Sequence, residues 1–137
     1  MSDAQDQEKG RVIGIGGVFI KSPDHQKLRS WYEAKLGLRG SPDQGLTLKW
    51  RSHRQPEEEH LTVWSAFPNT SEYFGPSTAP FMINYIVDDL DALLRKLEAQ
   101  GVEIDPKREE YDYGRFAWIY DPDGNKIELW EPAARVK

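Results

Sequence analysis

Cysteine is missing from this 137-residue chain. Its absence excludes disulfides, thiolate nucleophiles and metal sites built on cysteine. Long apolar runs are missing too: none approaches the roughly 20 residues that a membrane-spanning helix needs, so no membrane partner is expected. The first ten residues are polar and acidic and lack the apolar core of a secretory signal. We therefore expect a cytoplasmic protein whose residues 1–10 form a disordered tail.

An excess of positive charge is also missing. The formal net charge is -5, whereas a nucleic-acid-binding protein needs a basic face, so no nucleic-acid partner is expected. Apolar and aromatic residues are present in ordinary amounts for a globular protein, at 38% and 12%. A chain of this length and composition predicts one compact domain over residues 11–137.

The domain contains two similar halves. In the first, residues 12–21 are predicted to form a strand and 26–36 a helix capped by Asp24 and ended by Gly37. Residues 46–50 and 61–67 alternate as strands do. This first module spans about 11–68, and a linker rich in Pro, Ser, Thr and Gly follows over 69–80.

The second module, about 81–132, repeats the order of the first. A strand over 81–87 precedes a helix over 89–100 that Asp88 or Asp89 caps and Gly101 ends. The apolar patterns of the two helices superpose at an offset of 65 residues, and the two glycines at 64. The sequence thus predicts an α+β fold of two tandem βαβββ modules.

The end of the second module carries the strongest local pattern. Two alternating apolar runs flank the turn-forming segment 121–125, Asp-Pro-Asp-Gly-Asn, which predicts a β-hairpin. This loop sets three cross-strand pairs: Tyr120 with Lys126, Trp118 with Glu128, and Phe116 with Trp130.

Glu128 is the unusual residue of this hairpin. Side chains alternate across a strand, so Ile127 and Leu129 face one side while Glu128 and Trp130 face the other. Burying a carboxylate among tryptophans is costly without a partner. We therefore expect Glu128 to be functional, as an acid or base poised for proton transfer.

The duplicated βαβββ order and the sequence Asp-Pro-Asp-Gly-Asn-Lys-Ile-Glu-Leu-Trp over 121–130 resemble the vicinal oxygen chelate superfamily, which includes glyoxalase I, extradiol dioxygenases and bleomycin-resistance proteins. The resemblance covers about 12–132. It implies an open, cup-shaped mixed sheet with the helices outside, a small-molecule site in the cup, and a homodimer.

The metal enzymes of that family take ligands from the first and last strand of each module. These positions fall here on Glu128, Met82, Gly17, and Trp64 or Thr62. Glycine and tryptophan offer no side-chain ligand, and methionine is too soft for the metals of this chemistry. These departures from the family's ligand pattern predict no metal ion and no cofactor.

His60 leaves an alternative open. It has the strand parity of Thr62 and Trp64, and a register slip would bring it inward to share a metal with Glu128. The other reading places His60 in a solvated turn, because it follows three glutamates at 57–59.

The remaining site residues are mostly aromatic. Glu128 is the predicted catalytic residue, and the substrate-binding set consists of Phe19, Trp64, Asn84, Tyr113, Arg115, Trp118 and Trp130. Asn84 is expected on the inner side of its strand, where its amide can bond a ligand or Glu128. Tyr113 and Arg115 lie in the segment 110–115, which is either a mouth over the cup that recognises a ligand or an ordinary surface loop rich in Tyr and Asp.

Two functions follow from these expectations. The first is a glyoxalase-like, bleomycin-resistance-like protein that binds a small molecule in an aromatic cup and lacks the family metal site. The alternative is a divalent-metal-dependent lyase, isomerase or dioxygenase. The count of ligand-type residues favours the first.

Overall fold

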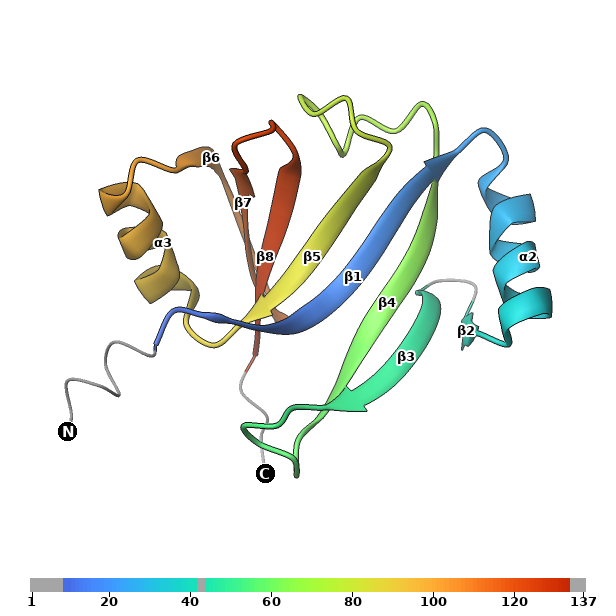
Figure 1. The fold of residues 1–137 in the computed structure, drawn as a ribbon, viewed down its shortest axis with the longest axis horizontal. Helices are drawn as coiled ribbons and strands as arrows, with labels where there is room; N and C mark the ends of the chain where they lie inside the picture. The colour runs from blue at the N-terminus through green and yellow to red at the C-terminus, as the bar shows by residue number, and fades with distance from the viewer. Residues whose placement is uncertain (1–8, 42–43, 134–137) are drawn as a thin grey trace. The chain divides into compact units, whose positions relative to one another are not determined.

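The computed structural model describes residues 9–41 and 44–133. They form two helices and eight strands in the order predicted for two βαβββ modules (Figure 1). The elements of the first module are β1 (Val12–Ser22), α2 (His25–Leu36), β2 (Arg39–Ser41), β3 (Gly45–Arg51) and β4 (Glu59–Pro68). Those of the second are β5 (Phe81–Val87), α3 (Leu90–Ala99), β6 (Glu103–Tyr111), β7 (Gly114–Tyr120) and β8 (Lys126–Pro132). The α+β fold class is confirmed.

The contacts divide these elements into two compact units. Among the described residues, the first unit spans 15–41 and 44–83, and the second consists of 9–14 together with 84–133. In the first unit, β2, β3 and β4 pair antiparallel and β1 pairs parallel with β4. In the second, β6, β7 and β8 pair antiparallel. Parallel and antiparallel pairs occur together, as the predicted mixed sheet requires.

Both helices begin and end as the sequence predicts. The Asp24 side chain accepts from the Lys27 N–H at the start of α2, and Gly37 ends that helix with φ 73°, a conformation that glycine adopts without strain. Asp89 caps α3 by accepting from the Ala92 N–H. Asp88 has a different role, because its Oδ1 accepts from the Gly10 and Arg11 N–H groups at 2.8 Å.

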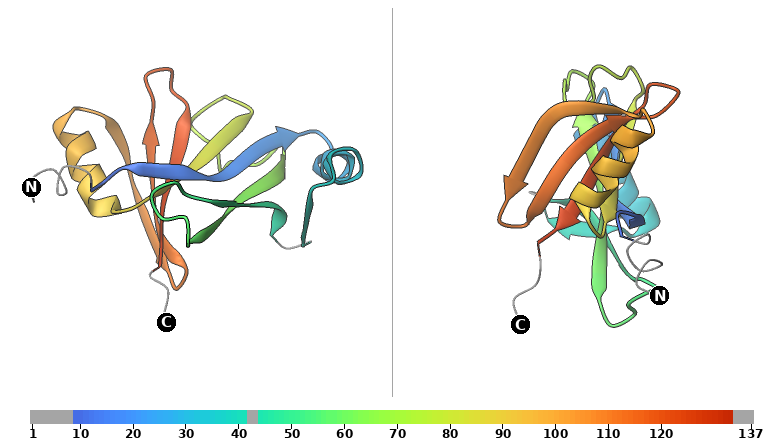
Figure 2. Two further views of the ribbon diagram at one scale, coloured as in Figure 1. Left: turned by 60° about the horizontal axis from the view of Figure 1, so that its bottom comes forward. Right: turned by 90° about the vertical axis from the view of Figure 1, so that its left-hand side faces the viewer.

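The core of the second unit lies between α3 and its strands (Figure 2). Leu90 and Leu94 of α3 pack with Ala117 and Ile119 of β7 and with Leu129 of β8. Because side chains alternate along a strand, this core fixes which residues of β7 and β8 face away from α3. We call that other surface the face opposite α3.

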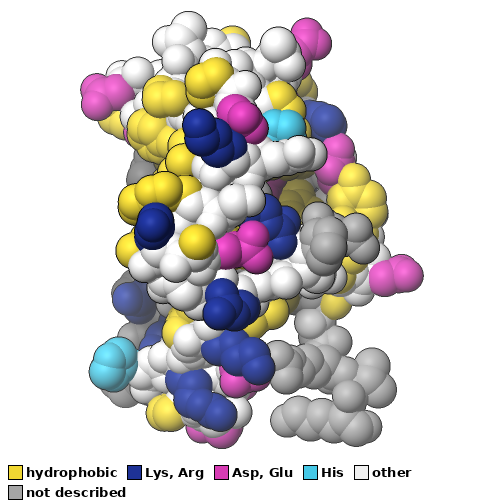
Figure 3. All heavy atoms as spheres, turned by 90° about the vertical axis from the view of Figure 1, so that its right-hand side faces the viewer, with side chains coloured by type: hydrophobic (Ala, Val, Ile, Leu, Met, Phe, Trp, Pro, Cys, Tyr) yellow, Lys and Arg dark blue, Asp and Glu magenta, His cyan; other side chains and the backbone are white. Residues whose placement is uncertain are grey.

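Helix α2 is less buried than predicted. The sequence places an apolar stripe on this helix, formed by Leu28, Trp31, Tyr32 and Leu36. None of the residues of α2 is buried, and Trp31 and Leu36 are 50% and 58% exposed. Seen from the side of α2, apolar side chains lie among lysines and arginines (Figure 3). The stripe is therefore partly a surface feature.

The predicted linker keeps its bounds of 69–80 between β4 and β5, and both it and the described end of the predicted tail contain packed residues. Residues 1–8 of the tail lie outside the described residues, whereas Gly10 is buried and bonded to Asp88. In the segment 69–80, Phe74 is fully buried with its ring 5.2 Å from that of Phe67. This segment thus contributes to the packing of the first unit. Among the described helices, none is long and apolar enough to cross a membrane.

Candidate functional site on the second unit

The hairpin of β7 and β8 positions the candidate site. Its register places Trp118 opposite Glu128 and Phe116 opposite Trp130, as the five-residue loop predicts. Ile127 packs against the α3 core together with Leu129, so Glu128 and Trp130 lie on the face opposite α3.

Glu128 is held by two nitrogen donors. Asn84 Nδ2 donates to Oε1 at 2.6 Å, and Trp118 Nε1 donates to Oε2 at 3.0 Å. Glu128 and Asn84 are each only 3% exposed. A buried carboxylate needs such donors to offset its lost hydration. The bond from Asn84 confirms one of the two partners expected for that amide.

Aromatic rings form a row that starts at Trp118, which donates to Glu128, and runs to the tip of the β6–β7 hairpin. The Phe116 ring is nearly parallel to that of Trp130, with centroids 5.9 Å apart, and lies 6.5 Å from the ring of Trp118. Tyr113 packs edge-on against Phe116 at 5.9 Å and stacks on Tyr111 at 5.1 Å. We call these five residues the aromatic row. Tyr111 and Phe116 were not among the predicted site residues, although Phe116 has the strand parity of Trp118.

Two lysines approach the ring of Trp118. Lys107 Nζ is 5.6 Å and Lys126 Nζ 5.9 Å from its centroid, within the range of cation–π attraction. Lys107 also pairs with Glu109 at 3.1 Å. Burial lowers the pKa of Lys126, while the charges of nearby Asp105 and Glu128 act to raise it.

Arg115 does not form the predicted mouth of the site. Its Nη2 donates to Asp91 of α3 at 2.6 Å, and its Nη1 lies 3.7 Å from Glu131. The bond to Asp91 raises the pKa of Arg115 and lowers that of Asp91. Arg115 shares the strand parity of Ala117, so it faces α3. The expectation that it contacts a ligand on the other face is wrong.

Tyr113 lies near its predicted place. Segment 110–115 is the tip of the β6–β7 hairpin, where Tyr111 pairs with Gly114. Tyr113 is 60% exposed at this tip, and its backbone oxygen accepts a long 3.4 Å bond from Trp130 Nε1.

In the first unit, Trp64 lies on the wrong face for the predicted role. Its ring stacks on Tyr32 of α2 with centroids 4.1 Å apart, so it packs beneath the helix. Phe19 lies as predicted on the face away from α2. Its ring contacts Phe67 at 5.4 Å, and Phe67 has the strand parity opposite to Trp64.

The residues at the family's metal-ligand positions do not fit a metal ion. Gly17 and Met82 are buried and offer no suitable donor, and both oxygens of Glu128 accept from N–H groups. Within residues 9–41 and 44–133, no cluster of three or more His, Cys, Asp or Glu side chains is placed to hold an ion.

His60 is engaged within the first unit. Its ring stacks on Trp50 with centroids 4.8 Å apart, and its Nε2 lies 3.7 Å from Glu58. Trp50 Nε1 in turn donates to Thr62 at 2.7 Å. This aromatic packing, rather than a solvated turn, accounts for the position of His60.

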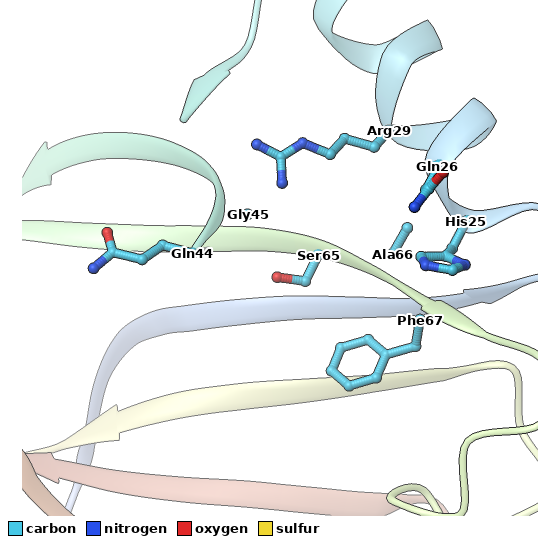
Figure 4. Close-up of a pocket in the computed structure, with 8 residues that line it drawn as sticks. All are labelled: His25, Gln26, Arg29, Gln44, Gly45, Ser65, Ala66 and Phe67. Carbon is cyan, nitrogen blue, oxygen red and sulfur yellow. The ribbon is translucent and has the colours of Figure 1, made fainter. Parts of the chain in front are cut away.

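The first unit also has an open hollow of about 360 Å³ beside α2 (Figure 4). None of the predicted site residues lines it. Its polar walls include His25, Gln26 and Arg29, with Ser65 on the strand side. The Arg29 Nη2 donates to the Ser41 backbone oxygen at 2.6 Å, and its Nε is 3.7 Å from Glu33. Its cationic group is therefore largely used in bonding α2 to the end of β2.

Comparisons with known proteins agree with this fold. The chain is similar to the crystal structure of methylmalonyl-CoA epimerase from Mycobacterium tuberculosis, with 23% identity, a TM-score of 0.55, and coverage of 93% of this chain and 92% of that one. It is also similar to a variant of the Streptomyces coelicolor methylmalonyl-CoA epimerase in complex with 2-nitronate-propionyl-CoA, with 17% identity, a TM-score of 0.63, and coverage of 90% and 100%. A third similar structure is described as the NAD-dependent benzaldehyde dehydrogenase from Legionella pneumophila, with 13% identity, a TM-score of 0.56, and coverage of 85% and 98%. At these identities the similarity shows a shared fold.

No curated protein sequence matches the chain. The profile of one family does match, over residues 14–129, which include most of both βαβββ modules and Glu128 itself. The chain therefore belongs to the Glyoxalase/Bleomycin resistance protein/Dioxygenase superfamily.

Proposed function

We propose that this protein binds a small, flat organic molecule on the face of the second unit opposite α3, without a metal ion. The observation that carries the proposal is Glu128, a 3% exposed carboxylate held by Asn84 and Trp118 beside the aromatic row. Ligand sites commonly combine large apolar surfaces with a few convergent polar groups. Glu128 is the principal polar contact in this proposal and Asn84 the second.

The rings of the aromatic row supply the apolar contact. Phe116 and Trp130 are partly exposed, and their parallel arrangement suits a flat partner. Trp118 is 1% exposed, so its contribution is the indole N–H that orients Glu128 rather than a free stacking surface. Tyr113 lies at the exposed edge of the row.

Metal-dependent chemistry is the alternative that the family offers. One of the similar epimerase structures is described as a complex with 2-nitronate-propionyl-CoA. In this chain, however, Gly17 and Met82 occupy positions at which metal ligands would be needed. The metal-free proposal rests on these residue types, and elemental analysis tests it: about one equivalent of zinc, nickel, iron or manganese in the purified protein would contradict it.

Binding is tested with a neutral, flat probe. We expect indole, followed by ligand-detected NMR and calorimetry, to bind the purified protein. Trp130→Leu should weaken binding by about three- to tenfold, because one stacking surface is lost. Trp31→Leu is the matched control, since it removes a half-exposed tryptophan from α2 and should leave the affinity unchanged. Equal affinities of the wild type and both variants would exclude the aromatic row as the site.

A further inference from the structure

The hollow beside α2 contains a strand edge that the sheet leaves open. The pairing of β3 with β4 begins at Leu46, which lies opposite Trp64. Just before Leu46 the chain turns at Gly45, whose φ is 80°, a conformation that glycine adopts without strain. Among the described residues, those of β4 after Ser65 therefore have a strand neighbour only on the side of β1.

The backbone of Ala66 faces this open edge. A Cβ on Gly45 would lie 2.7 Å from the Trp64 oxygen, so the carbonyl of Trp64 points towards β3. Along a strand, the N–H and C=O of one residue point to one edge and those of the next residue to the other. Ala66 comes two residues after Trp64 and so points both groups to the same edge, where it lines the hollow (Figure 4). No described residue pairs with it on that edge.

The open part of the edge is one residue long. Pro68, the next residue with this orientation, has no N–H, and its oxygen accepts from the Ser71 N–H at 3.0 Å. The edge therefore offers one donor and one acceptor, both from Ala66. In an antiparallel hydrogen-bonded pair, two opposite residues exchange both of their N–H···O bonds. The complement of this edge is thus a single amino-acid residue.

Side chains around Ala66 can hold the groups on either side of such a residue. His25 and Gln26 lie on the α2 side of the hollow and Ser65 on the strand side (Figure 4). Within residues 9–41 and 44–133, none of these three side chains has a hydrogen-bond partner, and each can donate or accept. Arg29 already bonds the Ser41 oxygen. The volume of about 360 Å³ lies in the range of small-molecule sites.

We propose that this hollow binds a small molecule built like one residue of a peptide, such as an N-acylated amino acid amide. The N–H of the ligand donates to the Ala66 oxygen, and its C=O accepts from the Ala66 N–H. His25 and Gln26 bond the flanking amide groups of the ligand. This site goes beyond the proposed function, because the hollow and the aromatic row share no residue.

Two ligands of nearly the same shape test the pairing. One is N-acetylalanine methylamide, and the other is its ester analogue, in which oxygen replaces the N–H that faces Ala66. We expect the amide to bind about three- to tenfold more tightly, because the ester cannot donate to Ala66. NMR titration gives both affinities. The backbone amide signal of Ala66 should shift on adding the amide ligand, and its hydrogen exchange should become slower.

Variants test the same contact from the side of the protein. Ala66→Pro removes the N–H at an open edge position, where proline is tolerated, and should weaken binding of the amide ligand by at least about tenfold. Thermal melts show whether this variant is folded, and the ester analogue tests the pairing without any substitution. Gln26→Ala should weaken binding by about two- to fivefold. Gln100→Ala, at the exposed end of α3, is its matched control and should leave the affinity unchanged.

The outcomes separate this proposal from the proposed function. Equal affinities for the amide and the ester, or an Ala66 signal that does not move, would overturn the pairing. A capped tetrapeptide of alanine that binds more than about tenfold more tightly than capped alanine would overturn the small-molecule assignment in favour of a protein segment. If neither ligand binds, the hollow is not the site of such a molecule, and the proposed function on the second unit stands.

Discussion

The two oxygens of Glu128 accept from two different donors, which makes glutamine a poor substitute for it. A Gln side chain has one oxygen, so its NH₂ group would face the N–H of either Asn84 or Trp118. We expect Glu128→Gln to lower the free energy of unfolding by about 1–3 kcal/mol, the cost of one unsatisfied buried donor. Thermal and denaturant melts measure it.

A paired substitution checks the cause of that loss. In Asn84→Asp combined with Glu128→Gln, the new amide can donate to the new carboxylate and accept from Trp118, which restores the donor–acceptor pattern. The double variant should be more stable than either single variant. Additive losses would show that the pattern of donors is not what holds Glu128. Arg115 plays no part in this balance, because its ion pairs are with Asp91 and Glu131.

The backbone of Gly114 lies directly against Trp130 of the aromatic row and leaves no room for a side chain. Its φ is 146°, and a Cβ there would lie 2.4 Å from Trp130 Nε1 and 2.6 Å from the Glu131 oxygen. We expect Gly114→Ala to destabilise the protein by about 2–4 kcal/mol, since a clash adds to backbone strain. Gly124→Ala is the control: its φ is 82° but nothing lies within 4 Å of its Cβ, so only about 1 kcal/mol should be lost. Equal losses would mean that contact with Trp130 has no effect.

Strands β6 and β7 are joined by a bond between Tyr120 and Asp105. The Tyr120 hydroxyl donates to Asp105 Oδ2 at 2.5 Å, and burial together with this bond raises the pKa of Tyr120 to about 12. The bond also lowers the pKa of Asp105. Because an unfolded tyrosine has a pKa near 10, this contribution is complete below pH 10 and is lost as the pH rises to about 12.

Replacing Tyr120 should remove that alkaline dependence. We expect Tyr120→Phe to be less stable than the wild type at neutral pH by about 1–3 kcal/mol, and the difference to shrink above pH 10. Unfolding by urea at several pH values measures both. Tyr113→Phe, at an exposed position, should keep the wild-type dependence; the same loss in both variants would remove the hydroxyl of Tyr120 as the cause.

The hairpin loop 121–125 and both helix caps were predictable, because turn and capping residues act through their immediate neighbours. The face of Trp64 was not. The two modules superpose at offsets of 64 and 65 residues, and a slip of one residue moves a strand side chain to the other face.

The wrong prediction for Arg115 has a different cause, because no local pattern in the sequence marks where β6 ends. β6 continues to Tyr111, and so the segment expected as a loop is a hairpin tip and Arg115 belongs to β7. The parity of Arg115 with Ala117 was available from the sequence and would have placed it toward α3. The unsatisfied Oδ1 of Asn84, by contrast, depends on where every nearby donor lies, which a pattern cannot give.

On the scale of the whole molecule, self-association remains a prediction. The first unit exposes large apolar side chains on α2, with Trp31 50% and Leu36 58% exposed. A specific interface buries more than about 1,000 Å² in total, and exposed apolar groups favour it. We expect a homodimer that uses α2.

Light scattering tests the dimer directly. The mass should be twice 15.8 kDa, and Trp31→Glu should shift it toward the monomer, whereas Lys35→Glu, which changes charge on the same helix, should shift it less. A monomer mass at all concentrations would rule the dimer out. A dimer unaffected by Trp31→Glu would place the interface elsewhere.

The bond between Gly10 and Asp88 joins residues 78 positions apart, and this has a consequence for how the chain is made. During synthesis, Gly10 leaves the ribosome long before the carboxylate that anchors it exists. The backbone oxygen of Lys9 accepts from Lys96 on α3, and this bond can form only after Lys96 has been synthesised, which is later still. The leading end of β1 can therefore reach its final position only after α3 has been synthesised, and until then it is open to chaperones and proteases.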